Sequence, residues 1–245
     1  MSAVASTMQP TNKTARFAGA LYVLLGLTAP FSLIYIPRAL IVRGDAAETA
    51  NRILASEMLF RLGIVSELAS ATITIFLVMV LYRLFNGVNK MHASLMVILG
   101  ALISAPISFL NVVSELAALT LLHAPRFLSV FDKSELEALA LFFLGLHAQG
   151  LVVAEILWGL WLFPFGLLVL RSGFLPRILG VLLIINGFAY LVASLTSLLA
   201  PSYAGLVNRF ALIPETGELW VMLWLLIKGA RVQPVAVTPD RPVAG

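Results

Sequence analysis

The residues best suited to chemistry are three glutamates that fall inside long apolar segments: Glu67, Glu155 and Glu218. A charged side chain inside a bilayer costs about 3 kcal/mol or more and usually faces the interior of a helix bundle. Glu67 and Glu155 stand at the same sequence distance before Arg83 and Arg171, so at about 1.5 Å per helical residue they lie at equal depth. Because all three segments run in the same direction across the membrane, we expect the three acids to converge.

Four other polar residues are predicted at neighbouring depths, namely Arg61, Asn111, Glu115 and His147. With the three glutamates they predict a polar, acidic cavity in the outer leaflet that opens to the extracytoplasmic side. Arg61, Glu115 and His147 are expected around its mouth. A cavity of this charge suits a cation, a proton or a small amphiphile, and binding or transport of such a ligand is the leading interpretation.

Small and hydroxyl-bearing residues recur at helical spacing on the same segments, which places them on single helix faces. They are Thr28, Ser32 and Tyr35; Gly63, Ser66, Glu67, Ser70 and Thr74; Gly100, Ser104, Ser108, Asn111 and Glu115; Asn186, Tyr190, Ser194 and Ser197. Such residues more often serve close helix packing than ligand binding. A lone glutamate can also be protonated and hydrogen-bonded to a neighbour. A structural or accessory membrane subunit is therefore an alternative function.

A divalent metal is a second chemical option, with Glu67, Glu155, Glu115 and His147 as candidate ligands. Carboxylate oxygens and imidazole nitrogens suit zinc, manganese or iron, and a bound metal can activate water. An intramembrane metal-dependent hydrolase is therefore another alternative, with a glutamate as general base. The chain has no cysteine, which excludes cysteine-ligated metal sites and thiolate nucleophiles. No nucleotide-binding or hydrolase motif is present, and catalytic residues stay unassigned.

The composition indicates that a lipid bilayer surrounds these residues. The chain is 60% hydrophobic and 11% charged, with a mean hydropathy of +1.00, whereas soluble domains carry roughly 25% charged residues. The net charge of +4 comes from basic residues spread over many short loops rather than gathered in one patch, so we expect no nucleic-acid partner. We expect a multi-pass protein of the cell (inner) membrane.

Six apolar runs are long enough to cross a bilayer as helices, which need roughly 20 residues each. They cover about residues 16–36, 59–82, 92–116, 141–170, 175–199 and 207–227. The predicted fold is therefore an all-α polytopic membrane helix bundle over residues 14–230, with flexible tails at 1–13 and 231–245. Lys and Arg are more numerous in the loops on the side of the termini, which favours both termini in the cytoplasm.

Two connections on the outer side are predicted to contain helix starts. Asp45 followed by Glu48 predicts a cap for a short amphipathic helix over residues 46–57, lying at the membrane interface. Ser134 with Glu137 predicts a capping box at the start of the fourth long helix. Prolines inside the runs predict kinks. They are Pro30, Pro106, Pro164 and Pro214.

Several short motifs occur together in one order along the chain. They are Gly44-Asp-Ala-Ala, Phe60-Arg-Leu-Gly63, Arg171-Ser-Gly-Phe-Leu-Pro-Arg-Ile-Leu-Gly180 and Gly217-Glu-Leu-Trp to Lys228-Gly229. In these, the chain resembles a family of bacterial membrane proteins of unknown function, DUF 4386, over about Ala15 to Gly229. The resemblance implies a multi-helix membrane fold of bacterial type. It implies no activity, so no catalytic residue is carried over from it.

Overall fold

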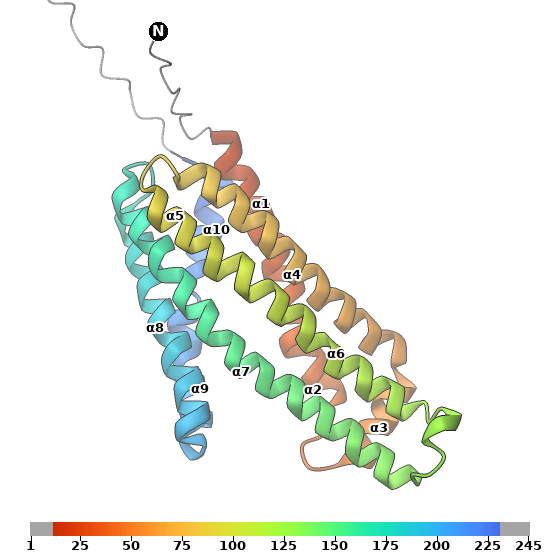
Figure 1. The fold of residues 1–245 in the computed structure, drawn as a ribbon. Coiled ribbons are helices and arrows are strands. Elements are labelled where there is room, and N and C mark those ends of the chain that lie inside the picture. Colours follow the sequence, from red (N-terminus) through yellow and green to blue (C-terminus); the bar gives the residue numbers. More distant parts are fainter. Residues whose placement is uncertain (1–11, 231–245) are drawn as a thin grey trace, which may run out of the picture.

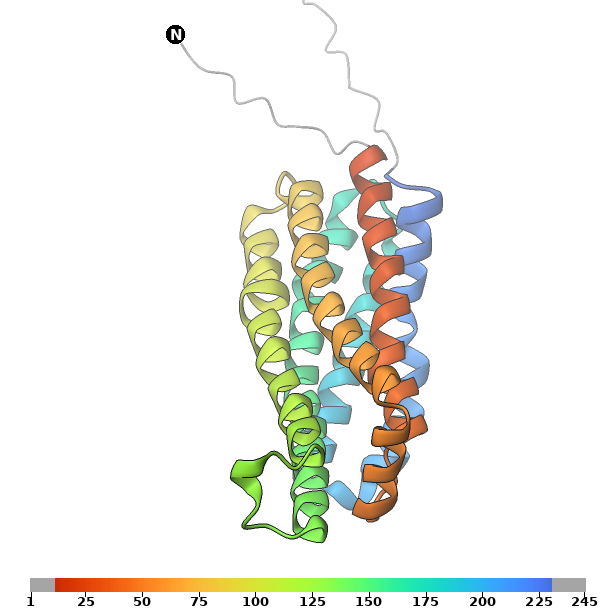
Figure 2. The same cartoon turned by 90° about the vertical axis from the view of Figure 1, so that its right-hand side faces the viewer.

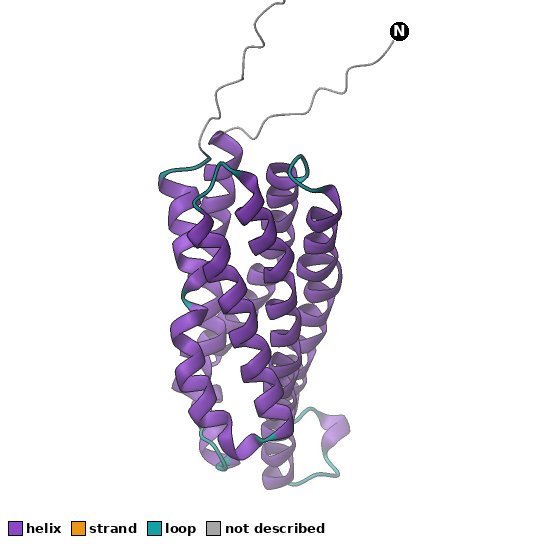
Figure 3. Cartoon of the chain, turned by 90° about the vertical axis from the view of Figure 1, so that its left-hand side faces the viewer, coloured by secondary structure: helices purple, strands orange, loops and turns teal. Residues whose placement is uncertain are grey.

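The computed structural model describes residues 12–230, and within this range every regular element is a helix (Figures 1 and 3). This confirms the predicted all-α bundle. The predicted tails lie outside the described residues, except that Asn12 and Lys13 already belong to the first helix. The two ends of the described chain lie at the same end of the bundle, as an even number of crossings requires (Figure 1).

Five of the six predicted crossings are helices long and apolar enough to span a membrane. Two of them contain a π-helical segment, so that the first and third crossings are each built of three consecutive pieces. The elements are α1 (Asn12–Pro30), η1 (Phe31–Tyr35) and α2 (Ile36–Leu40); α4 (Glu57–Phe85); α5 (Lys90–Val97), η2 (Ile98–Ile103) and α6 (Ser104–Leu122); α7 (Lys133–Ser172); and α8 (Arg177–Leu199). Pro30 directly precedes η1 and Pro106 closely follows η2, whereas α7 continues through Pro164.

The sixth predicted crossing is made of two shorter helices, α9 (Pro201–Glu215) and α10 (Gly217–Ile227), with a break at Thr216. Pro214 lies two residues before the break, and it weakens the last turns of α9 because it has no amide hydrogen to donate and its ring clashes with the preceding turn. α9 starts where α8 ends, and α10 finishes beside the start of α1, where Arg16 donates to the carbonyl of Ile227 at 3.2 Å (Figure 2). The pair therefore returns across the bundle as one interrupted crossing.

The two connections opposite the termini each contain a capped helix start. Asp45 accepts a hydrogen bond from the Glu48 amide at 2.9 Å and caps α3 (Ala46–Ala55), as predicted. The predicted Ser134–Glu137 capping box is wrong. α7 is instead capped by Asp132, which accepts from the Glu135 amide at 2.9 Å while the Glu135 side chain accepts from the Asp132 amide. The reason is local geometry: Asp132 still has extended backbone, whereas Ser134 is already helical.

The apolar core of the described residues forms two large clusters at opposite ends of the bundle and a small third one of Ala189, Ala193 and Ala211. The first large cluster lies toward the termini and contains Phe85 and Phe165 among other large side chains; the second lies toward α3 and contains Ile36 and Phe60. Several buried polar side chains fall between them along the helices, namely Ser32, Glu67, Ser70, Ser104 and His147. Glu115 is also buried and lies on α6 between Val112 and Ala118 of the second cluster. The bundle thus encloses a polar layer between its two large apolar clusters.

Glycines bring α7 and α8 into backbone contact. A Cβ at Gly159 would lie 2.7 Å from the carbonyl oxygen of Gly187, and a Cβ at Gly180 would lie 2.7 Å from that of Gly166. In lipid, helices associate largely through such close van der Waals packing. We call these two pairs the glycine seam. It fixes the position of α7, the helix that carries His147.

Candidate functional site

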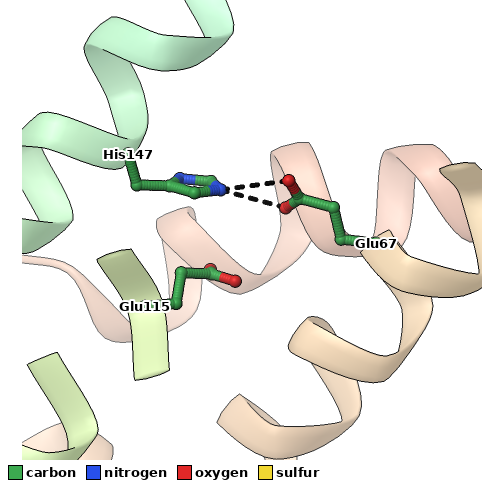
Figure 4. Close-up of side chains that lie close together, drawn as sticks. All are labelled: Glu67, Glu115 and His147. Atoms are coloured by element: carbon green, nitrogen blue, oxygen red, sulfur yellow. Dashed lines mark hydrogen bonds and ion pairs between the residues drawn. The ribbon is translucent and has the colours of Figure 1, made fainter. Parts of the chain in front are cut away.

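The polar layer is centred on Glu67, Glu115 and His147, which come from α4, α6 and α7 (Figure 4). The Nε2 atom of His147 lies 3.0 and 3.2 Å from the two carboxylate oxygens of Glu67. One ligand atom from each of the three residues lies within 4.8 Å of the others. All three side chains are buried, with 5%, 6% and 7% of their surface exposed. We call this group the Glu-Glu-His cluster.

Hydrogen bonds between α4 and α1 set the position of Glu67. Ser66 donates to the carbonyl of Thr28 at 3.0 Å, and Ser70 donates to the Thr28 hydroxyl at 2.8 Å. These two serines flank Glu67 in the sequence. The predicted polar faces of the first and second crossings therefore contact each other, and part of their role is helix packing.

Asn111 and Gly150 set the position of His147. The side-chain amide of Asn111 on α6 donates to the backbone carbonyl of His147 at 3.1 Å. A Cβ at Gly150 would lie 2.0 Å from Asn111 Oδ1, so only glycine leaves room for this side chain. Gly150 thus lets α6 hold the turn of α7 that carries the imidazole.

Glu218, which is half-buried, forms a second polar group at the start of α10. The hydroxyl of Tyr22 on α1 donates to one of its carboxylate oxygens. The side-chain amide of Asn186 on α8 donates to the other at 3.2 Å. Glu218 therefore links three helices that are distant in sequence.

A pocket of about 370 Å³ joins the two groups, because both Glu67 and Glu218 line it. Its other polar lining residues are Tyr22, Ser32, Ser70, Thr74, Ser104, Ser108, Trp158, Trp161, Tyr190 and Thr216. The remaining lining side chains are apolar. Both π-helical segments contribute, through Ser32, Leu33 and Ile34 of η1 and Gly100 of η2. Interruptions of this kind in helices are frequent at functional sites.

The structure brings some of the predicted site residues together and leaves others apart. Glu67, Glu115 and His147 form one cluster, Asn111 supports it, and Glu218 shares the pocket with Glu67. Glu115 and His147 are buried, so they do not lie at an exposed mouth.

Two further predicted residues lie elsewhere. Glu155 is half-buried on α7; it is outside the three-residue cluster and is not a lining residue, although Leu151 and Trp158 on either side of it are. Arg61 is exposed and forms an ion pair with Glu57, at 2.6 Å, one helical turn away. Neither contributes a ligand atom to the cluster.

Tyr22 could not be selected from the sequence, because it lies in an apolar run without polar neighbours. Asn186 was recognised as part of a polar face, but not as a partner of Glu218. Both contacts join residues far apart in the chain, and helix periodicity alone gives no rotation of one helix relative to another. The glycine pairs did leave a signal, since Gly159 and Gly166 show the same spacing as Gly180 and Gly187.

The cluster has the donor set of a metal site. Two carboxylates and one imidazole are ligands for zinc, manganese or iron. Glu67, Glu115 and His147 are available for this role, while Glu155 lies outside the group. Without a metal, the same residues form a buried hydrogen-bonded pair, Glu67 with His147, beside a second acid, Glu115.

Comparison with known proteins finds one family model that covers nearly all of the described bundle. A family model described as a domain of unknown function (DUF4386) matches residues 17–229. An uncharacterized protein of Archaeoglobus fulgidus is 32% identical over 84 residues, which are 34% of this chain and 49% of the relative. The chain thus spans about half the length of that curated relative. No solved structure matches the chain.

Proposed function

Since the chain belongs to the DUF4386 family, which has no assigned activity, we propose a function from the geometry: the pocket binds a small organic cation with an apolar body. The observation that carries the proposal is the lining of the pocket. Two carboxylate residues from different helices, Glu67 and Glu218, line a space bounded mainly by apolar and hydroxyl-bearing side chains.

The sign of the lining favours a cation. Among the described residues that line the pocket there are two acids and no lysine, arginine or histidine. In a low-dielectric interior, such a lining attracts positive charge far more strongly than it would in water. An anion at the same place would face the Glu67 and Glu218 carboxylates directly, because His147, which contacts Glu67 at 3.0 Å, is not itself a lining residue.

Aromatic side chains add to this preference. Trp158 and Tyr190 both line the pocket, and their rings meet edge to face with centroids 6.1 Å apart. Trp161 also lines it, and packs against Phe165 with centroids 5.5 Å apart. Indole and phenol faces attract organic cations, with an interaction worth about 2 kcal/mol when the site is desolvated. The pocket volume is also within the range for small organic ligands, roughly 300–1,000 Å³.

The exposed lining residues indicate where such a ligand enters. Pro30 and Ile34 lie at the α1–η1 junction, and Thr216 and Leu219 lie at the break between α9 and α10; all four are exposed and line the pocket. We place the opening between these two helix interruptions, on the membrane-facing side of the bundle. An amphiphile dissolved in the bilayer would reach Glu218 from there.

The test is equilibrium binding of labelled benzyltrimethylammonium to the protein in lipid nanodiscs. We expect saturable binding to the wild-type chain and at least about a tenfold weaker affinity for Glu218→Gln, which corresponds to about 1.4 kcal/mol. Gln keeps the size of the side chain and can still accept a hydrogen bond from Tyr22 or Asn186.

The matched control is Glu48→Gln, which removes one negative charge from α3, away from the pocket. Its affinity should equal that of the wild type. Equal affinity of Glu218→Gln and Glu48→Gln, or no saturable binding to the folded wild type, would contradict the proposal.

A metal-dependent hydrolase is the second candidate, because Glu67 belongs both to the Glu-Glu-His cluster and to the lining of the pocket. A metal held by that cluster would lie next to a ligand in the pocket. This function requires bound metal, and turnover of an ester or amide substrate that stops when the metal is removed would establish it. Loss of stability without loss of any binding in Glu67→Gln and Glu218→Gln would instead favour an accessory subunit.

A further inference from the structure

We propose that Glu67, Glu115 and His147 bind a divalent transition-metal ion of the zinc class. The inference shares Glu67 with the proposed organic-cation site, but it depends on the contacts of Glu67 with Glu115 and His147 rather than on Glu218. The three residues come from α4, α6 and α7, and one potential ligand atom of each lies within 4.8 Å of the others.

The spacing suits a metal after small side-chain movements. Zinc binds nitrogen and carboxylate oxygen at about 2.0–2.1 Å, so two ligand atoms of a tetrahedral site lie about 3.3 Å apart. His147 Nε2 is already 3.0 and 3.2 Å from the oxygens of Glu67. Glu115 approaches the same point from the neighbouring helix (Figure 4). The Glu67–His147 separation therefore already matches a metal site, and Glu115, within 4.8 Å, has to move closer to complete it.

Glu115 supplies an independent indication that a ligand belongs here. Its Oε2 atom is buried and has no hydrogen-bond partner, although the side chain is more than nine-tenths buried. Buried polar atoms without a partner are rare in native structures and costly. A metal ion between Glu115 and the Glu67–His147 pair would satisfy this oxygen.

Charge balance leads to the same conclusion. A His147 cation paired with Glu67 offsets only one of the two acids, so the second acid must be protonated or neutralised. With neutral imidazole, a divalent cation offsets both carboxylates and leaves the cluster without net charge. This matters at membrane depth, where uncompensated charge is expensive.

The cluster also has a position open for a fourth ligand. Glu67 lines the pocket, whereas Glu115 and His147 lie behind it. Three protein ligands with one open position is the arrangement of catalytic zinc sites, whereas structural sites are closed by four. Asn111 stabilises this geometry by holding the carbonyl of His147 at 3.1 Å. Water or a ligand group in the pocket would complete the coordination.

The test uses the full chain in nanodiscs, purified without a polyhistidine tag, stripped with a chelator and titrated with Zn²⁺. We expect one equivalent by elemental analysis for the wild type. Second-shell changes alone weaken metal affinity by about 10 to 100-fold, so loss of a ligand in Glu115→Gln should weaken it by at least about 100-fold. Co²⁺ in place of Zn²⁺ should give the visible absorption of a low-symmetry site with one nitrogen ligand.

Glu137→Gln is the matched control. Glu137 is a buried acid like Glu115, but it lies on α7 outside the cluster and pairs with Lys133 at 3.5 Å. The variant should bind one equivalent, like the wild type. Folding of each variant is checked by its elution as a monodisperse species and by its thermal transition. If Glu115→Gln fails to fold, the Co²⁺ spectrum of the wild type still tests the site, because it reports the metal ligands without any variant.

Stoichiometric metal that is lost in Glu115→Gln but kept in Glu137→Gln supports the site. No metal above background in the folded wild type, or equal affinity in wild type and Glu115→Gln, overturns it. The result is distinct from that for the organic cation, since Glu218 lies outside the cluster and Glu218→Gln should bind Zn²⁺ normally.

Discussion

The two sides of α7 use small residues for opposite purposes. Toward α8, the glycine seam brings backbone against backbone, with no space for a side chain at Gly166 or Gly180. Toward α6, Gly150 makes room for the side chain of Asn111, which in turn holds the turn carrying His147. The first arrangement builds the frame and the second builds a polar site within it. The role of a glycine in a membrane helix therefore depends on which atom packs against it, a backbone atom or a side-chain atom.

The largest effect is expected from Gly180→Leu in the glycine seam. Even a Cβ would lie 2.7 Å from the Gly166 carbonyl oxygen and 3.0 Å from the Leu170 amide nitrogen, and both are backbone atoms that cannot rotate away. We expect loss of the folded bundle, measured as aggregation on size exclusion and loss of the cooperative thermal transition. Gly180→Ala should fold with stability lower by about 1–3 kcal/mol.

Gly145→Ala is the matched control for the seam, because Gly145 lies on the same helix with nothing within 4 Å of an added Cβ. Its stability should equal or exceed that of the wild type, since alanine favours helix by roughly 1 kcal/mol over glycine. Equal losses in Gly145→Ala and Gly180→Ala would show that helix flexibility, and not the seam, explains the effect.

The next largest effect is expected from His147→Ala in the absence of metal. The change leaves the Glu67 and Glu115 carboxylates buried side by side without the imidazole. Breaking a buried pair costs about 3–5 kcal/mol in soluble proteins, and polar contacts in membranes average less, so we expect a loss of about 2–3 kcal/mol. Reversible unfolding in mixed micelles measures it.

The double variant Glu67→Gln with His147→Ala sharpens this prediction. It removes the charge that His147 leaves behind, so it should be more stable than His147→Ala alone. Additive losses from the two single changes would mean that Glu67 and His147 are not energetically coupled. The glycine seam offers no such rescue, because backbone overlap cannot be removed by changing a second side chain.

A smaller effect is expected from Gly150→Ala. The new Cβ would overlap Asn111 Oδ1, and this side chain can rotate away at the cost of its hydrogen bond to the His147 carbonyl. We expect a loss of about 1 kcal/mol. Asn111→Ala in the Gly150→Ala background should then cost almost nothing further, which a double-mutant cycle on thermal stability can measure. A full additional loss would show that Asn111 acts elsewhere.

Arg61→Gln should have the smallest effect. Arg61 is exposed and pairs with Glu57 one turn away on α4, and exposed ion pairs contribute little to stability. Thermal stability, cation binding and zinc binding should all equal those of the wild type. Weaker binding of benzyltrimethylammonium to Arg61→Gln would contradict this expectation and support the predicted place of Arg61 at the mouth of the cavity.

Five crossings and the short helix after Asp45 were predictable because their signals are local: apolar length, loop charge and a capping side chain. The broken sixth crossing was only partly predictable, since Pro214 indicated a kink but not a full break at Thr216. The capping box was misplaced by two residues because two overlapping cap patterns occur between Asp132 and Glu137.

The candidate site was predictable in composition but not in arrangement. Acids in apolar runs identified Glu67, Glu155 and Glu218, since intramembrane charge is costly wherever it occurs, and similar depth added Glu115 and His147. Which of them meet depends on helix rotation, and the sequence carries no direct signal for that. Glu155 was grouped with Glu67 by depth alone, and depth does not distinguish neighbouring faces of a helix.

The central claim is that the pocket in the polar layer selects positive charge. The most direct measurement compares benzyltrimethylammonium with neopentylbenzene, its uncharged carbon isostere, as competitors for labelled cation on the wild-type protein in nanodiscs. We expect displacement by the cation at concentrations at least about tenfold lower than by the isostere, after correction for partition into lipid. Equal potency of the two compounds would show that the pocket selects shape and apolar surface alone, and would contradict the role assigned to Glu218.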